Sequence, residues 1–175
     1  FKVNLGFNIT YNQNRITNLN LFNDPNFIGN KVGGISGGTG NTVQINAVGT
    51  ARNTFFVYQQ VYNEDGKPLD GVFVDRNLDG QITDQDLYKY KTPDGNVFLG
   101  FSSNISYKKW SGGFTMRSNL NNYVYNNVAS STGTFRNIFN PLEFLSNGST
   151  DILNSGFSGA GDKYFLSDYY VQNAS

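Results

Sequence analysis

The first eleven residues alternate between apolar and polar side chains. Odd positions from Phe1 to Tyr11 are apolar or aromatic, and even positions from Lys2 to Thr10 are polar or glycine. A β-strand places successive side chains on opposite faces, so the pattern predicts a strand over residues 1–11 with one apolar and one polar face. Such a strand fits a soluble sandwich, and it equally fits a membrane barrel with lipid outside and an aqueous lumen inside.

Two later segments repeat this alternation and predict a hairpin. Strands are predicted over residues 97–109 and 113–125, with a tight turn at 109–112 between them. The alternation slips at Asn121–Asn122, which indicates a bulge or the end of a strand. Each predicted strand is long enough to cross a bilayer at the tilt of a barrel strand. A fourth strand-like segment covers residues 163–175.

Aromatic residues lie at both ends of the predicted hairpin. Tyr107 and Trp110 are at the end with the short turn, and Tyr123 and Tyr125 are at the opposite end. This arrangement matches the two aromatic girdles of a transmembrane barrel, where rings sit at the two membrane interfaces. The alternative is a soluble hairpin whose aromatic residues belong to an ordinary core.

The segments between the strands are long and polar. Residues 12–96 and 126–162 contain short strand-like runs within Asn- and Gly-rich sequence. Connections of this length are unusual in compact soluble domains but ordinary on the extracellular side of an outer-membrane barrel. The 26 Asn and 20 Gly residues favour turns, and the 15 Phe and 11 Tyr residues favour strands. The sequence therefore predicts an all-β, antiparallel fold with extracellular loops over 12–96 and 126–162.

Composition excludes several functions. The 13 basic and 13 acidic residues balance, which argues against nucleic-acid binding because that needs a basic surface. Cys and His are absent, which removes the usual zinc, haem and iron–sulfur ligands and the common nucleophilic triads. Since no paired-carboxylate cleft is recognisable either, the sequence does not predict an enzyme. No apolar run approaches the roughly 20 residues of a transmembrane helix.

Residues 75–86 match a twelve-residue calcium loop position for position. Asp75, Asn77 and Asp79 supply side-chain oxygens at positions 1, 3 and 5, and Gly80 at position 6 permits the sharp turn. Calcium takes six to eight oxygen ligands, and this spacing wraps the chain around one point. The predicted ligands of Ca²⁺ are Asp75, Asn77, Asp79, the backbone carbonyl of Gln81, Thr83 and Asp86.

The loop departs from an EF-hand in two respects. Position 12 is Asp86 rather than the Glu that binds calcium through both carboxylate oxygens in an EF-hand. A short Val72–Val74 strand precedes the loop where an EF-hand has a helix. A structural calcium staple therefore fits better than a sensor. The alternative is an ion-free turn, because Asp, Asn and Gly build turns unaided.

A series of motifs runs from Phe55 to Asn126. An aromatic stretch, a D-x-N-x-D-G-x-I-x-x-x-D loop, a Gly-Phe strand, a Tyr-Lys turn and a closing Tyr-Asn pair follow one another. They are Phe55–Tyr58, Asp75–Asp86, Gly100–Phe101, Tyr107–Lys108 and Tyr125–Asn126. In this order they resemble the C-terminal part of the barrel in SusC/RagA-type TonB-dependent outer-membrane transporters. Residues 1–20 resemble the preceding strand, and Tyr170–Ser175 resembles the start of the next. One departure from the family pattern is the proline expected before the Gly-Phe strand: here Pro93 stands seven residues before Gly100.

The resemblance implies a segment of an about 22-stranded transmembrane β-barrel with a plug. It implies a location in the cell outer membrane and import of oligosaccharides or peptides. The implied partners are the remainder of the same barrel, outer-membrane lipid, a SusD-like lipoprotein lid, and TonB acting through N-terminal parts beyond this chain.

Two alternatives remain open at this point. The aromatic residues Phe55, Phe56, Tyr58 and Tyr62 either pack within the first long loop or stack on the sugar rings of a substrate. The chain as a whole also fits a soluble, secreted β-rich module for calcium binding or adhesion.

Overall fold

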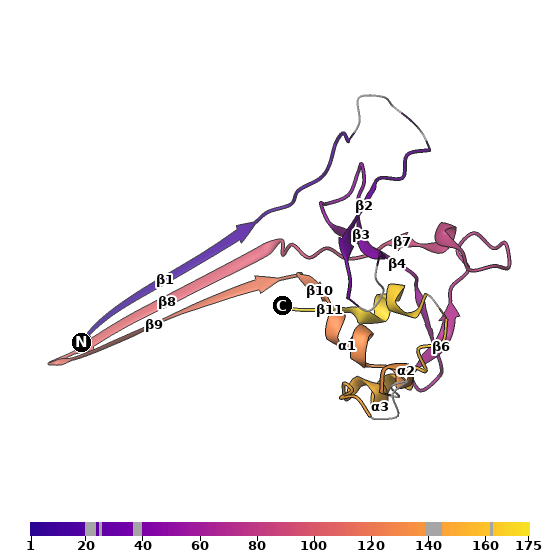
Figure 1. Cartoon of the computed structure of the whole chain (residues 1–175). Helices are drawn as coiled ribbons and strands as arrows, with labels where there is room; N and C mark the ends of the chain where they lie inside the picture. Colours follow the sequence, from indigo (N-terminus) through magenta and orange to yellow (C-terminus); the bar gives the residue numbers. More distant parts are fainter. Residues whose placement is uncertain (20–23, 25, 37–39, 139–144, 162) are drawn as a thin grey trace.

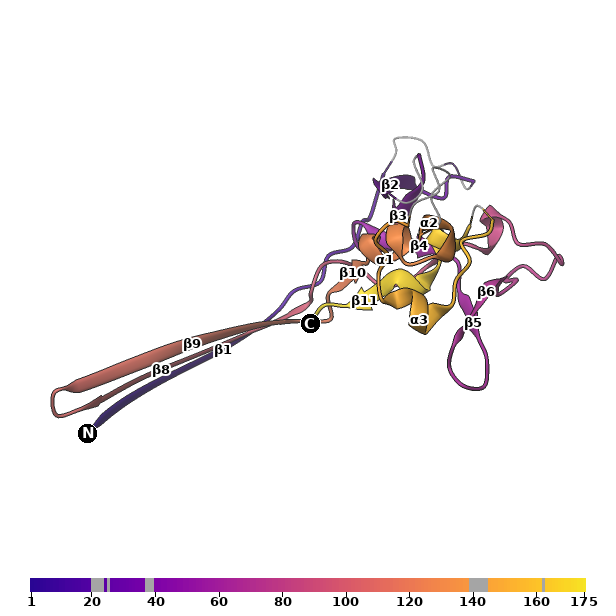
Figure 2. The same cartoon turned by 60° about the horizontal axis from the view of Figure 1, so that its bottom comes forward.

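The structure, a computed structural model, describes residues 1–19, 24, 26–36, 40–138, 145–161 and 163–175. The parts of the predicted loops that fall between these ranges lie outside the described residues. Figures 1 and 2 show a long, thin sheet that projects from one side of a compact group of short elements. The long sheet consists of β1 (Lys2–Tyr11), β8 (Val97–Tyr107) and β9 (Trp110–Leu120). We call the other described residues, apart from Phe1 and the Lys108–Lys109 turn, the loop region.

The long sheet is antiparallel, with strand order β1-β8-β9. Its register joins like with like: Phe7 pairs with Phe101, which pairs in turn with Met116. Directly paired residues point to the same face, so the apolar positions of all three strands form one continuous surface. The next row, Asn8, Gly100 and Arg117, lies on the opposite, polar face.

Solvent reaches the apolar face of the long sheet. Leu5, Phe7 and Met116 are 67%, 69% and 62% exposed. All residues of the long sheet are described. Ser103, in the central strand, is the one buried residue among them. Figures 1 and 2 show no second layer of described residues on the sheet. The sheet therefore presents a full apolar face that the described chain leaves uncovered.

The loop region is built from short elements. A four-stranded sheet has the order β2-β3-β4-β7, and two-stranded pairs are formed by β5 with β6 and by β10 with β11. The strands are β2 (Asn30–Gly34), β3 (Thr42–Asn46), β4 (Thr54–Val57), β5 (Gln60–Tyr62), β6 (Pro68–Phe73), β7 (Tyr88–Lys89), β10 (Tyr123–Tyr125) and β11 (Val171–Asn173). The helical turns are η1 (Asp84–Asp86), α1 (Asn127–Thr132), α2 (Phe135–Ile138), α3 (Asp151–Ser155), η2 (Tyr164–Leu166) and η3 (Asp168–Tyr170).

An aromatic core holds the loop region together. Phe55 and Tyr58, from the first predicted loop, pack in one cluster with Phe157 and Tyr170, from the second half of the chain. Each of these four side chains is at most 2% exposed. The rings of Phe157 and Tyr170 meet edge to face with centroids 6.1 Å apart. The two segments predicted as separate extracellular loops thus share one hydrophobic core.

The hairpin turn differs from the predicted one. Trp110 pairs with Tyr107, so Lys108 and Lys109 form a two-residue turn, two positions before the predicted centre. Lys108 adopts a positive φ of 53°, as two-residue hairpin turns require. At the other end β9 stops at Leu120, and Asn121 turns the chain with a φ of 61°. The sequence slip therefore marks a strand end, and Tyr123–Tyr125 belongs to a separate strand.

The strand predicted over residues 163–175 is limited to Val171–Asn173. Tyr164, Phe165 and Leu166 are all buried in the core. An extended strand would send alternate side chains to opposite faces, so three consecutive core residues require the chain to turn, and η2 provides that turn. The segment 126–162, predicted as a loop, also contains α1, α2 and α3. Strands nevertheless dominate, and the fold is all-β with antiparallel sheets. Among the described residues, no helix is long and apolar enough to cross a membrane.

Candidate functional site

The two predicted aromatic girdles differ in the structure. At the hairpin end, Tyr107 and Trp110 project outward and are 52% and 81% exposed. At the other end, Tyr125 donates a hydrogen bond of 2.6 Å from its hydroxyl to the carbonyl of Phe165 and packs near Tyr170. Tyr125 thus joins the core of the loop region, whereas the pair at the hairpin end is free to meet an interface.

The predicted calcium loop folds as a series of tight turns. The carboxylate of Asp75 accepts hydrogen bonds from the backbone amides of Leu78 and Gly80, at 2.7 and 2.8 Å. The side-chain oxygen of Asn77 accepts from the amide of Asp79. Gly80 has a φ of +80°, which residues other than glycine rarely adopt. Asp75, Asn77 and Asp79 therefore share the start of one sharply curved loop.

Asp86, the last predicted ligand, closes the loop from within. Its carboxylate accepts hydrogen bonds from the backbone amides of Arg76 at 2.8 Å and Thr83 at 2.7 Å. The side chain is fully buried. The amide hydrogen bonds, that of Thr83 foremost, hold the pKa of Asp86 below its usual value. Asp86 thus lies against the first turn of the loop and also caps η1 through Thr83.

The oxygens of this loop only partly meet the requirements of a calcium site. Among the described residues, no three acidic side chains are gathered into a metal-binding group. The side-chain nitrogen of Asn77 donates a hydrogen bond to the carboxylate of Asp79 at 2.9 Å. A carboxylate oxygen has two lone pairs, so Asp86 can accept an amide hydrogen bond and still face a cation. The curvature and the placement of Asp86 therefore fit a calcium loop, and the side chains of Asn77 and Asp79 would have to turn their oxygens toward the ion.

Three contacts fasten the loop to the rest of the loop region. Lys31 forms an ion pair of 2.9 Å with Asp84. The ammonium group of Lys163 donates a hydrogen bond to the backbone carbonyl of Ile82. Tyr58 donates its hydroxyl to Asp84 at 3.4 Å, and burial followed by this negative charge raises the pKa of Tyr58 to about 12. The loop is thus attached at Ile82 and Asp84, both between its predicted ligands.

The four aromatic candidates divide into two groups. Phe55, Phe56 and Tyr58 are 1%, 9% and 0% exposed, so they pack within the loop region and have no surface to offer a sugar ring. Tyr62 is 48% exposed and is the one member of the set that a ligand can reach.

A partly buried polar cluster around Asp168 was not predicted from the sequence. Asp168 accepts hydrogen bonds from the hydroxyl of Tyr88 at 2.6 Å and from the backbone amide of Gln60 at 3.0 Å. The side chain of Gln60 accepts from Ser167 and donates to the carbonyl of Leu69. Burial raises the pKa of Asp168. Because these partners are 80 or more residues from Asp168 or Ser167, no local sequence signal could have identified the cluster.

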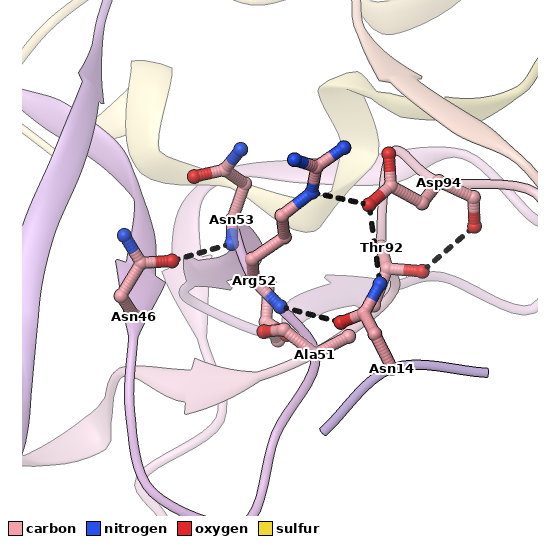
Figure 3. A network of polar contacts seen from close by, with 8 residues as sticks. Asn14, Asn46, Ala51, Arg52, Asn53, Thr92 and Asp94 are labelled. Atoms are coloured by element: carbon pink, nitrogen blue, oxygen red, sulfur yellow. Dashed lines mark hydrogen bonds and ion pairs between the residues drawn. The ribbon is translucent and has the colours of Figure 1, made fainter. Parts of the chain in front are cut away.

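A polar cavity of about 780 Å³ lies where the long sheet meets the loop region. Asp94 receives hydrogen bonds on one oxygen from Arg52 Nε at 2.9 Å and from the side-chain amide of Asn14 at 3.4 Å. Asn14 in turn accepts from the backbone amide of Arg52. In Figure 3, neither the terminal nitrogens of Arg52 nor the second carboxylate oxygen of Asp94 bonds to any of the other residues drawn. Arg15 and Lys89 also line this junction cavity.

Comparison with known proteins gives one informative match. The chain is 42% identical over 181 aligned residues to the TonB-dependent receptor SusC of Bacteroides thetaiotaomicron. The alignment covers 100% of this chain and 17% of that receptor. No protein-family model matches the chain. The resemblance to SusC-type TonB-dependent receptors is thereby confirmed, and the chain corresponds to a small part of its relative's length.

Proposed function

We propose that this chain, which is similar along its whole length to a SusC-type TonB-dependent receptor, forms part of the wall and the extracellular face of an outer-membrane nutrient importer. The observation that carries the proposal is the uncovered apolar face of the long sheet, backed by a face that is polar or glycine except at Phe98. A water-soluble protein would bury such a face against a second layer. A barrel wall turns it toward lipid and lines an aqueous lumen with the polar face.

The dimensions of the long sheet suit a membrane. Each of β8 and β9 has 11 residues, which corresponds to roughly 37 Å at about 3.4 Å per residue. At a barrel tilt of about 40° this length spans about 28 Å, close to the hydrocarbon thickness of a bilayer. The exposed Tyr107 and Trp110 then sit at one membrane interface.

The sheet needs partner strands. Within the described residues, the outer edges of β1 and β9 are not paired with any strand. In hydrocarbon each unpaired backbone group costs several kcal/mol, so an open edge is not tolerated there. The remainder of an about 22-stranded barrel would supply these partners and close the wall.

The loop region is assigned to the extracellular side. It caps the end of the long sheet opposite the two-residue turn, and outer-membrane barrels have short turns on the periplasmic side. A folded core there suits a fixed vestibule for oligosaccharides or peptides, on which a SusD-like lipoprotein would close. TonB would act through parts of the transporter beyond this chain.

We assign calcium to residues 75–86 as a structural staple. Asp75, Asn77, Asp79, Thr83 and Asp86 would supply side-chain oxygens and Gln81 its carbonyl. The ion would draw the carboxylates of Asp75, Asp79 and Asp86 together and stiffen the loop. The spacing, the left-handed Gly80 and the inward Asp86 support this role.

The alternative, a soluble secreted module for calcium binding or adhesion, has less support. The exposed stripe of Leu5, Phe7 and Met116 would be an aggregation hazard in water.

Epitope tags on intact cells test the proposed topology. One tag is placed after Asp65, in the turn of the β5–β6 hairpin, and the other between Lys108 and Lys109. In the complete transporter, an antibody should bind the first tag on intact cells and the second only after lysis. Binding to the Lys108 tag on intact cells, or failure of the Asp65 tag to bind until lysis, would reject the assignment.

A further inference from the structure

The long sheet carries no negative charge. Its three strands contain no Asp or Glu, although the chain has 13 acidic residues. Two cations, Lys2 and Arg117, lie on its polar face. Lys2 is at the hairpin end, whereas Arg117 lies well inside the span. Arg117 is thus the one charged residue inside the span of this face, and its positive charge attracts anions.

Arg117 is presented in an open position. It lies in one row with Gly100 and Asn8, across all three strands. The side chain of Asn8 lies over Gly100, in the space that a β-carbon would occupy. Arg117 is exposed, and it makes no hydrogen bond or ion pair with any of the described residues. Gly100 has no side chain and that of Asn8 is short, so the guanidinium of Arg117 is accessible from the polar face of the sheet.

Two hollows flank this row and continue to the junction cavity. They measure about 470 and 340 Å³ and share Asn8, Gly100 and Arg117. The larger hollow also shares Phe98 and Asn119 with the junction cavity. A continuous path, lined mainly by polar residues with Phe98 among them, thus runs from the loop region to the middle of the sheet.

The charge along this path is positive. Arg15, Arg52 and Lys89 line the junction cavity, and Arg117 lines both hollows. Asp94 is the one carboxylate among the described lining residues, and Arg52 and Asn14 already bind one of its oxygens. The other lining groups include many Asn, which both donate and accept hydrogen bonds and so suit hydroxyl groups.

We propose that this path recognises an acidic oligosaccharide, and that Arg117 binds a carboxylate of this cargo, with Asn8 beside it. Arginine grips a carboxylate with two parallel hydrogen bonds, and the cations of the junction cavity attract the same charge at the entrance. The amide-rich lining binds the sugar hydroxyls. This inference deepens the proposed transport function and rests on it, since it takes the polar face to line the lumen.

Binding of a matched pair of sugars tests the proposal. The probes are α-1,4-linked trigalacturonate and its carboxyl-reduced form, galactotriose, titrated calorimetrically into the complete transporter in detergent at low salt. The parent should bind trigalacturonate about tenfold or more tightly than galactotriose. Arg117→Gln should abolish most of this preference, and Arg117→Lys should retain more of it. Equal binding of the two sugars by the parent, or an unchanged preference in Arg117→Gln, would overturn the proposal.

A matched control separates this site from general charge effects. Lys109→Gln removes the same charge at the hairpin turn, away from the path, and should leave the preference intact. If Arg117→Gln lowers the temperature at which the barrel unfolds on a gel but does not change sugar binding, Arg117 pairs with a carboxylate of the transporter itself, and the proposal fails. If the epitope tags report the expected topology while the sugars bind equally, the proposed function stands and this inference alone is rejected.

Discussion

The hydroxyl of Tyr88 donates a 2.6 Å hydrogen bond to the carboxylate of Asp168, across 80 residues of sequence. This bond joins β7, which follows the predicted calcium loop, to η3, which leads into the last strand. The second oxygen of Asp168 accepts from the backbone amide of Gln60. One side chain thus links three segments of the loop region, two of them from the first predicted loop.

Removing the acceptors of Asp168 should loosen the loop region. Asp168→Leu leaves the amide of Gln60 without a partner, which costs about 1–3 kcal/mol. Asp168→Asn keeps an oxygen for that amide and offers an NH₂ group to Tyr88. We expect hydrogen exchange of residues 54–62 in the complete transporter to accelerate strongly in the Leu variant and weakly in the Asn variant. Equal exchange in both variants would show that these hydrogen bonds do not secure the region.

The same residue gives the loop region a pH dependence. Burial raises the pKa of Asp168, so the folded state binds the proton more tightly than the unfolded chain. The resulting stabilisation is complete below the unfolded pKa of about 3.9 and is lost as pH rises through the folded value. Protection of residues 54–62, corrected for intrinsic exchange rates, should fall over that window. Asp168→Asn should remove this component, and a pH profile unchanged by the substitution would contradict the assignment.

The strands of the long sheet were predictable from sequence because a two-residue alternation states directly which face each side chain occupies. The alternation in residues 1–11 corresponds to β1, Lys2–Tyr11. The exact hairpin turn was not predictable from sequence. The predicted turn includes Trp110, whereas in the structure Trp110 pairs with Tyr107 as the first residue of β9.

The loop region was beyond local sequence analysis. Its strands are mostly three to six residues long, and its core joins Phe55 and Tyr58 to Phe157 and Tyr170. Nothing in the neighbourhood of these residues indicates which distant segment they contact. The composition of Asn and Gly suggested irregular loops because it reports turns, whereas the fold depends on the aromatic residues between them.

Added bulk at Gly100, on the polar face of the long sheet, requires Asn8 to move. A β-carbon there would overlap the side-chain oxygen of Asn8, so Gly100→Ala must displace Asn8. A β-carbon on Gly112, in the neighbouring strand, would meet open space. We expect Gly100→Ala to cost about 1 kcal/mol and Gly112→Ala to cost less, measured as the heat-induced unfolding of the complete transporter on gels. A larger loss for Gly112→Ala would contradict the described register.

Calcium binding can be checked at residues 75–86. Asp79→Ala removes a predicted ligand at position 5, while Asp65→Ala removes a similar charge in the exposed turn between β5 and β6. Calcium titration of the complete transporter should show at least about tenfold weaker binding for Asp79→Ala and unchanged binding for Asp65→Ala. Identical titrations of Asp79→Ala and the parent would retire the calcium assignment.

The two faces of β1 offer the most direct measurement. Phe7 and Asn8 are neighbours, and the pairing of β1 with β8 places them on opposite faces. This chain has no cysteine, so Phe7→Cys and Asn8→Cys can each carry a single nitroxide label within it. In the complete transporter, freed of other reactive cysteines and reconstituted in a bilayer, the label at Phe7 should collide mainly with oxygen dissolved in lipid. The label at Asn8 should collide mainly with a water-soluble nickel chelate. Scanning residues 3–10 should repeat this contrast at every second position. Equal access of both reagents at Phe7 and Asn8, or shielding of Phe7 from lipid, would contradict a wall that separates membrane from lumen.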